Sequence, residues 1–181
     1  MTDEGEVEAL TRRWLERVVI GLGLCPFAKA VHVKGQVRYV VSQARHPDEL
    51  LEALEIELRA LEASDPALVD TTLLIHPEVL RDFLDYNDFL SEADALLVRL
   101  ELDGVLQIAS FHPEYRFADS EPTDAANYTN RSPFPILHLL RESSITRAVE
   151  SFPDPDSIYE RNIATVTNLG VDALKRLMAG D

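Results

Sequence analysis

The stretch that decides the fold runs from residue 36 to residue 76, where two strand-like segments flank a helical one. QVRYVVS at 36–42 is rich in β-branched and aromatic residues, and TTLLIH at 71–76 has the same character. Between them, PDELLEALEIELRALEA at 47–63 has a proline in its first turn and leucines that recur at helical spacing. A strand, a helix and a second strand in this order predict a right-handed crossover and a parallel strand pair.

The segments outside this stretch extend the same pattern. The expected elements are an amphipathic helix at 4–20 closed by Gly21 and Gly23, a short strand at Val31–Val33 in a hairpin with 36–42, a helix at 77–99 interrupted near Tyr86 and Asn87, a strand at 104–111, and helices at 134–150 and in the C-terminal segment 156–181. We therefore expect a single compact α/β domain over residues 1–181, bordering on α+β. Its sheet of three or four strands is at least partly parallel and is covered by helices.

Composition excludes several classes of function. The 181 residues include 17 Lys and Arg against 32 Asp and Glu, a net charge of −15, which disfavours nucleic-acid binding and electrostatic attachment to a membrane. Cys25 is the only cysteine, so no intrachain disulfide can form. The acidic start MTDEGEVEAL lacks the basic and apolar regions of a signal peptide, and we expect a cytoplasmic protein.

Three histidines, each followed by proline, lie after the three predicted strands. His76 and His112 come directly at strand ends, and His46 follows four residues after its strand. If the strands run parallel, all three histidines lie at the carboxyl edge of the sheet, where open α/β folds bind ligands. The alternative is that each proline opens the next helix and the histidine is an incidental turn residue. Imidazoles from His76, His112 and either His46 or His138 are also weak candidates for a metal site.

Cys25 lies in GLGLCPFAK at 21–29, after a glycine turn and before a proline. If Pro26 begins a helical turn, the thiol occupies the N-cap, where backbone N–H groups favour the thiolate. A nearby histidine would then serve as base for a nucleophilic site. The alternative is a small apolar cysteine packed in the core.

A long polar segment at 112–132 is predicted to be an ordered functional loop, because it carries several aromatic residues. Arg131, just inside its end, and Arg141, beyond it, offer the planar fork that matches carboxylate or phosphate. Tyr128 and Asn130 lie beside Arg131, while His138 and Arg141 are three residues apart on one face of a predicted helix. The alternative is that the arginines pair with acidic residues and brace the loop.

Seven stretches carry a resemblance to a known family. They are VIGLGLCPFAK, VRYVVS, TTLLIHP, DFLDYNDFL, QIASFHPEYRFA, NYTNRSPFPILHLLRE and IYERNI, and they run in order from about residue 18 to residue 169. The chain resembles the bacterial family called domain of unknown function 1415 (DUF1415). The resemblance implies a bacterial, cytoplasmic protein but no mechanism. It increases the weight on Cys25, His112 and Arg131, because these polar residues stand within the matching stretches.

Taken together, these residues predict an enzyme that acts on a small anionic metabolite at the carboxyl edge of the sheet. His112 is the expected general acid or base, Cys25 the nucleophile or redox thiol, and His76 a polarising group. Substrate binding is expected from a group of polar residues in and after the polar loop: Arg131, Asn130, Tyr128, Arg141 and His138. The alternatives are a histidine-ligated metal-dependent or metal-binding protein and a noncatalytic ligand-binding module. The cofactor, if any, and the oligomeric state are not predicted.

Overall fold

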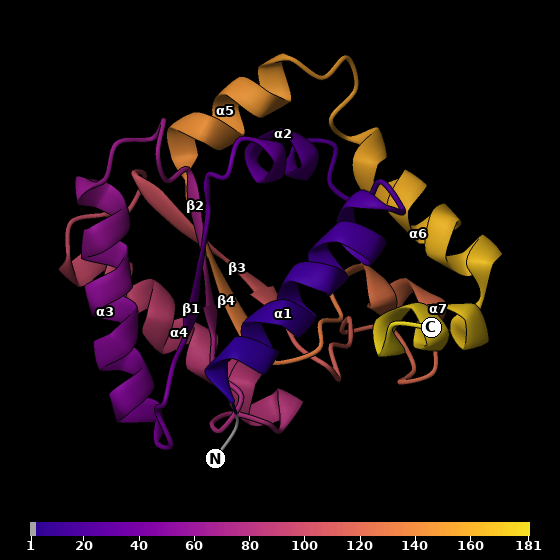
Figure 1. The fold of residues 1–181 in the computed structure, drawn as a ribbon, viewed down its shortest axis with the longest axis horizontal. Coiled ribbons are helices and arrows are strands. Elements are labelled where there is room, and N and C mark those ends of the chain that lie inside the picture. The colour runs from indigo at the N-terminus through magenta and orange to yellow at the C-terminus, as the bar shows by residue number, and fades with distance from the viewer. Residues whose placement is uncertain (1–2) are drawn as a thin grey trace.

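The computed structural model describes residues 3–181 and consists of a four-stranded sheet with helices on both faces (Figure 1). The first half contains α1 (Glu4–Trp14), the π-helix η1 (Leu15–Ile20), α2 (Ala28–Val33), β1 (Val37–Val41), α3 (Pro47–Ala63), β2 (Thr71–Ile75) and α4 (Phe83–Arg99). The second half contains β3 (Leu106–Phe111), the 3-10 turn η2 (Ala125–Thr129), β4 (Ile136–Arg141), α5 (Glu142–Glu150), α6 (Ser157–Leu169) and α7 (Val171–Ala179). The predicted α/β class, with a partly parallel sheet, is confirmed.

The sheet has the order β1-β2-β4-β3. β1 pairs with β2 in parallel, and α3 makes the crossover between them as predicted. β4 is antiparallel to both of its neighbours, β2 and β3. β3 therefore runs in the same direction as β1 and β2, although β4 separates it from them, and the three predicted strands end at the same edge of the sheet.

The prediction of a helix from residue 134 was wrong for its first part, because Ile136–Arg141 is the interior strand β4. A strand buried on both faces reads as a nearly continuous apolar run, and periodicity alone does not separate such a run from a buried helix. Alternation along β4 places His138 and Arg141 on opposite faces of the sheet, so they do not share a helix face.

Two further predicted elements differ from the structure. Val31–Val33 is the last turn of α2 and not a strand, so no hairpin forms across Lys34 and Gly35. The helix expected from residue 77 begins at Phe83, where the side chain of Asp82 accepts hydrogen bonds from two backbone N–H groups of the first turn. It continues without a break through Tyr86, because the tyrosine is fully buried against the sheet.

The two faces of the sheet are covered by different helices. α3 and α4 pack against one face and enclose a core formed with leucines of β2, β3 and β4. α1, η1, α6 and α7 contribute to a second core against the other face, as expected for the N- and C-terminal helices. In Figure 1 this second face lies behind α1, with α2 and α5 at its upper rim.

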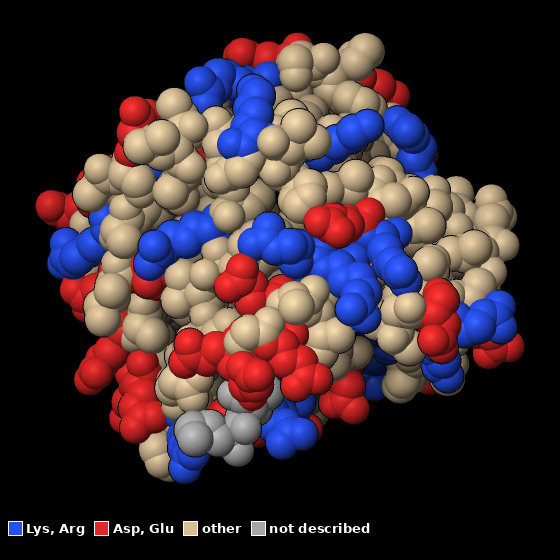
Figure 2. Space-filling model, viewed as in Figure 1, with Lys and Arg blue, Asp and Glu red and all other residues tan. Residues whose placement is uncertain are grey.

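The surface over α1 carries both signs of charge. Figure 2 shows basic and acidic side chains interspersed on the face seen in Figure 1, despite the net charge of −15. No helix within residues 3–181 combines the length and the apolar character needed to cross a bilayer.

Candidate functional site

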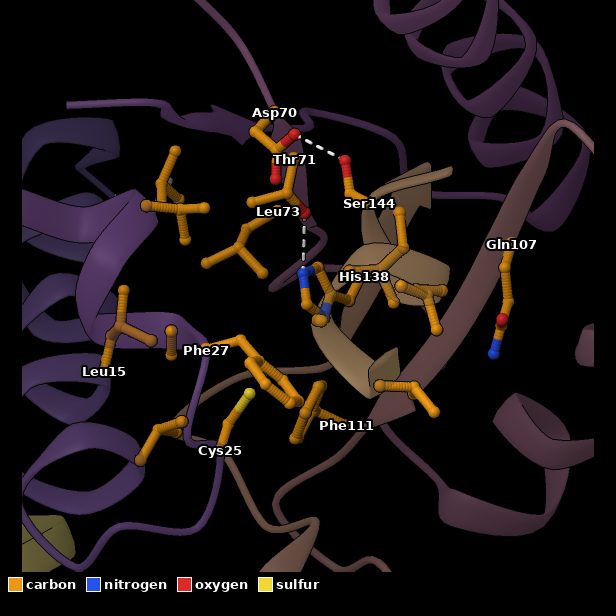
Figure 3. Close-up of a pocket in the computed structure, with 18 of the residues that line it drawn as sticks. Leu15, Cys25, Phe27, Asp70, Thr71, Leu73, Gln107, Phe111, His138 and Ser144 are labelled. Carbon is orange, nitrogen blue, oxygen red and sulfur yellow. Dashed lines mark hydrogen bonds between the residues drawn. The ribbon is translucent and has the colours of Figure 1, made fainter. Parts of the chain in front are cut away.

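A cavity of about 360 Å³ lies between the sheet and the helices at the upper rim of the second face (Figure 3). Its walls come from α1 and η1, from the segment around α2 and from α5, and its floor comes from all four strands. The lining residues are Trp14, Leu15, Val19, Cys25, Phe27, Ala28, Val31, Val37, Asp70, Thr71, Leu73, Gln107, Phe111, His138, Leu140, Ser144, Ile145, Ala148 and Val149. Ligand sites commonly occupy roughly 300–1,000 Å³ and are mainly apolar, which this cavity matches.

One wall of the cavity follows from the sequence of α5. Ile145, Ala148 and Val149 recur at helical spacing on one face of this helix and all line the cavity. No residue of α5 is fully buried, because its apolar face meets the cavity and not a packed core. Beyond the helix, Phe152 packs edge-on against Phe27, with ring centroids 6.1 Å apart, and so joins the end of this wall to the segment before α2.

The opposite wall contains the π-helical turn η1. The N–H of Gly21 donates to the carbonyl of Glu16, and the N–H of Leu24 donates to the carbonyl of Val19, both at the five-residue spacing of a π-helix. Gly21 is required there, because a Cβ would collide with the carbonyl oxygen of Arg17. The π turn continues the first helix past Trp14, so that Leu15 and Val19 both reach the cavity.

His138 is a polar ring on the cavity floor, where Thr71 and Gln107 also lie. Its Nε2 lies 2.7 Å from Thr71 Oγ1, and that hydroxyl donates to the carbonyl of Leu139 at 2.6 Å. Because the hydroxyl hydrogen is committed, Nε2 carries the ring hydrogen and donates to the hydroxyl. Nδ1 then presents a lone pair and has no hydrogen-bond partner among the described residues. Burial lowers the pKa of His138 to about 4, so the ring is neutral at pH 7.

A carboxylate and a hydroxyl lie at one end of the cavity. Ser144 Oγ donates to Asp70 Oδ1 at 2.7 Å, which ties the first turn of α5 to the residue before β2 (Figure 3). Asp70 makes no ion pair within residues 3–181. The cavity is therefore lined by two acceptors, the Asp70 carboxylate and His138 Nδ1, and by the Gln107 amide, which can both donate and accept. No Lys or Arg of the described chain lines it.

Cys25 lines the end of the cavity away from Asp70, beside Phe27 and Phe111 (Figure 3). Its thiol is partly exposed, so it belongs to the cavity wall and is not sealed in the core. Pro26 opens no long helix, since α2 begins only at Ala28. Of the three predicted catalytic residues, Cys25 is the one that reaches this cavity.

His76 and His112 lie together as their strand-end positions predicted, but in a closed core on the α4 side. Both rings are 0% exposed, and both pack on Tyr86, with centroid distances of 5.8 and 5.0 Å. His76 Nδ1 donates to the carbonyl of Val79 at 3.0 Å, and His112 Nε2 donates to that of Leu80 at 3.1 Å. Burial lowers the pKa of His76 to about 4 and also lowers the pKa of His112.

The two rings therefore brace the turn at residues 79–80, and His76 Nε2 is buried without a partner. His46 lies exposed at the N-terminus of α3. No group of three or more His, Cys, Asp or Glu side chains in the described part of the chain has metal-binding geometry. The expected sharing of one cavity by His76, His112, Cys25 and Arg131 is not what the structure shows.

The polar loop is ordered by the residues that were expected to bind substrate. Arg131 donates from Nε to the carbonyl of Tyr115 at 3.1 Å and from Nη2 to that of Pro122 at 2.7 Å. Its guanidinium lies over the ring of Tyr128, 4.6 Å from the centroid, and Asn130 Nδ2 donates to the carbonyl of Ser110. The loop uses these side chains to satisfy its own backbone.

Arg141 also donates to backbone carbonyls, on the face of the sheet opposite to the cavity. Its Nη2 donates to the carbonyls of Ser64 and Val69, both at 2.9 Å, and so holds the connection between α3 and β2. Sequence reasoning did not identify Asp70 or Ser144 as site residues, because each looks like an ordinary turn or helix-start residue. The apolar spacing of Ile145, Ala148 and Val149 on a helix that follows a strand was the available signal.

The family comparison agrees with the motifs. The model of the family described as protein of unknown function (DUF1415) matches residues 6–176. The chain belongs to the DUF1415 family. No curated protein and no solved structure is detectably similar to it. In this member of DUF1415, the matched region spans all four strands and the whole cavity lining.

Proposed function

We propose that this DUF1415 protein binds a small, mainly apolar organic molecule in the cavity between the sheet and α5. The observation that carries the proposal is an apolar cavity of about 360 Å³ whose floor presents one uncharged imidazole. A ligand with a hydroxyl or N–H group would donate to His138 Nδ1 and bury the rest of its surface against the apolar walls. This corresponds to the noncatalytic ligand-binding alternative from the sequence.

The cavity supports a small anionic ligand less well. Arg131 and Arg141 donate to backbone carbonyls elsewhere in the fold, and neither lines the cavity. The Asp70 carboxylate at one end would repel a carboxylate or phosphate. A buried anion needs paired cations or several N–H donors, and the lining residues do not supply them.

The test uses a neutral apolar fluorophore, N-phenyl-1-naphthylamine, whose emission rises in apolar surroundings. We expect saturable binding to the wild-type protein and weakened binding to Ala148→Phe, which places a ring inside the cavity. The matched control is Thr146→Phe, which adds the same ring on the exposed side of α5 and should bind as the wild type does. Equal binding by all three proteins, or none by the folded wild type, would overturn the proposal.

Two residues provide independent readouts of the same site. Trp14 is the only tryptophan and lines the cavity, so ligand entry should shift its emission. Cys25 is the only cysteine and lies at the far end, so a bound ligand should slow its reaction with a thiol reagent. If the ligand slows the reaction of Cys25 but does not raise the urea midpoint of unfolding, the ligand consumes the thiol reagent and does not bind the protein.

An enzyme that uses Cys25 is a second proposal, favoured by the fact that Cys25 and His138 line one cavity. Thiol labelling of the folded protein against pH discriminates between the two. A labelling midpoint well below the ordinary thiol value of about 8.5 supports an activated nucleophile. A midpoint at about 8.5 contradicts an activated nucleophile, and noncatalytic binding then remains as the proposed function.

We also propose a bacterial cytoplasmic setting for this function. The proposal is supported by the absence of a second cysteine in the sequence, since proteins of oxidising compartments commonly rely on disulfides. Fractionation of cells that express the native protein tests it. Recovery in the periplasmic fraction would contradict it.

A further inference from the structure

The polar groups of the cavity are arranged at different depths, and their chemistry selects among apolar ligands. Asp70 and Ser144 lie at one end, His138 lies midway, and Phe27, Phe111 and Cys25 lie at the other end (Figure 3). The polar end is thus separated from an aromatic end within one cavity. An elongated ligand with one polar terminus fits this arrangement better than a ligand that is apolar throughout.

The polar end accepts hydrogen bonds and carries negative charge. Asp70 Oδ1 is occupied by the hydroxyl of Ser144, whereas no hydrogen bond to Oδ2 is present in the described part of the molecule. Asp70 makes no direct ion pair within residues 3–181, and the cation linked to it is Arg147, whose Nη2 donates at 3.3 Å to the same Ser144 hydroxyl. Because Arg147 reaches Asp70 only through Ser144, a partly buried carboxylate oxygen without a direct cationic partner is still available to water or to a cationic ligand.

His138, midway along the cavity, also presents an acceptor, while the Gln107 amide on β3 can both donate and accept. Because Thr71 takes the hydrogen of His138 Nε2, the lone pair at Nδ1 is the group available to a ligand. An ammonium group is a donor with no acceptor capacity, so both exposed acceptors match it. The net charge of −15 adds a long-range attraction for cations.

We infer that the cavity takes an amphiphilic amine, with its ammonium group at Asp70 and its apolar body against Phe27 and Phe111. The inference rests on the proposed binding function and names the ligand class for the same site. A primary amine joined by a short chain to an aryl or alkyl group satisfies both ends. A carboxylate on the same body places like charges together at Asp70 and is excluded.

The test compares three probes that share one apolar body: 2-phenylethylamine, 2-phenylethanol and phenylacetate. Each competes at pH 7 and low salt with bound N-phenyl-1-naphthylamine on the wild-type protein. We expect the amine to bind about tenfold more tightly than the alcohol, which is the range of an ion pair in a partly buried site, and the acid to bind least. Raising the salt concentration should reduce the advantage of the amine and leave the alcohol unchanged.

Two variants assign the preference to Asp70. Asp70→Asn keeps an acceptor for Ser144 and should reduce the amine to within about threefold of the alcohol, because the charge attraction is removed. Glu62→Gln makes the same change of net charge on the exposed end of α3 and should retain the full preference.

The outcomes separate this inference from the proposed function. If the fluorophore binds but the amine and the alcohol compete equally, the amine inference is wrong and the binding function stands. If the preference exists and survives Asp70→Asn while the variant remains folded, the ammonium group does not lie at Asp70. If the fluorophore does not bind in the cavity at all, the proposed function itself fails.

Discussion

Two helices that follow strands, α3 and α5, present similar amphipathic patterns and yet produce opposite surroundings. α3 fully buries Leu50, Leu54 and Leu58, with each at 0% exposure, against the sheet and α4. α5 has apolar residues at the same helical spacing and buries none of them fully. An apolar helix face therefore shows which side of the helix turns inward. It does not show whether that side packs in a core or lines a cavity.

The difference comes from the other helices that pack on each face of the sheet. α3 is 17 residues long and lies beside α4, whose own apolar side chains fill the space above the sheet. α5 has 9 residues and meets the short helix α2 and the π turn η1 across the cavity. The helices at this rim are too short and too few to close the space above four strands.

The largest expected effect is on stability, from removing a side chain on the filled face. Leu58→Ala should lower the free energy of unfolding by about 2–5 kcal/mol, because it leaves a closed void in a packed core. Ile145→Ala, on the cavity wall, should cost less than about 1 kcal/mol, since the residue is only partly buried. Urea unfolding measures both, and equal losses would contradict the difference between the two faces.

Acid should destabilise both faces through their neutral histidines. Burial lowers the pKa of His76 and His138 to about 4 in the folded protein, below the unfolded value of about 6.5. Between these values the unfolded chain binds more protons, so stability is complete above about pH 6.5 and is lost progressively as the pH falls towards 4.

The contribution of the cavity can be separated with one variant. Between pH 7 and pH 4.5, the free energy of unfolding of His138→Gln should fall by about 2–3 kcal/mol less than that of the wild type, because the titrating ring is absent. Urea unfolding at the two pH values gives the comparison. A variant with the wild-type pH dependence would show that His138 does not titrate in this range.

A smaller effect is expected at the strand-end core. Tyr86 donates to the carbonyl of Ile136 at 2.7 Å and accepts from the N–H of Phe111 at 3.1 Å, and it lies on the α4 side. Tyr86→Phe should cost about 1–3 kcal/mol, because two buried backbone groups lose their partner. Fluorophore affinity should be unchanged, and a parallel loss of affinity would mean that the two faces are coupled.

The smallest effect is expected in the polar loop. Arg131→Lys keeps the charge but replaces the fork that reaches the carbonyls of Tyr115 and Pro122, and should cost about 1 kcal/mol. Fluorophore binding should not change, since Arg131 does not line the cavity. A loss of binding at unchanged stability would restore this arginine as a ligand-binding residue.

The sequence by itself determined the parts of this protein that depend on local pattern. The strands near 36–42, 71–76 and 104–111 and the helix at 47–63 follow from β-branched runs, proline at a helix start and leucine spacing, all of which act within a few residues. The common edge for His76 and His112 followed in turn from the shared direction of β2 and β3.

The tertiary structure alone decided the identity of β4 and the location of the cavity. The run ILHLLR becomes a strand because β2 and β3 offer it two unpaired edges, a condition that no local pattern contains. That pairing turns His138 toward η1 and α5 and turns Arg141 to the opposite face. Asp70, Cys25, His138 and Ser144 come from four separate segments, and burial against a shared sheet face is the physical cause of their meeting.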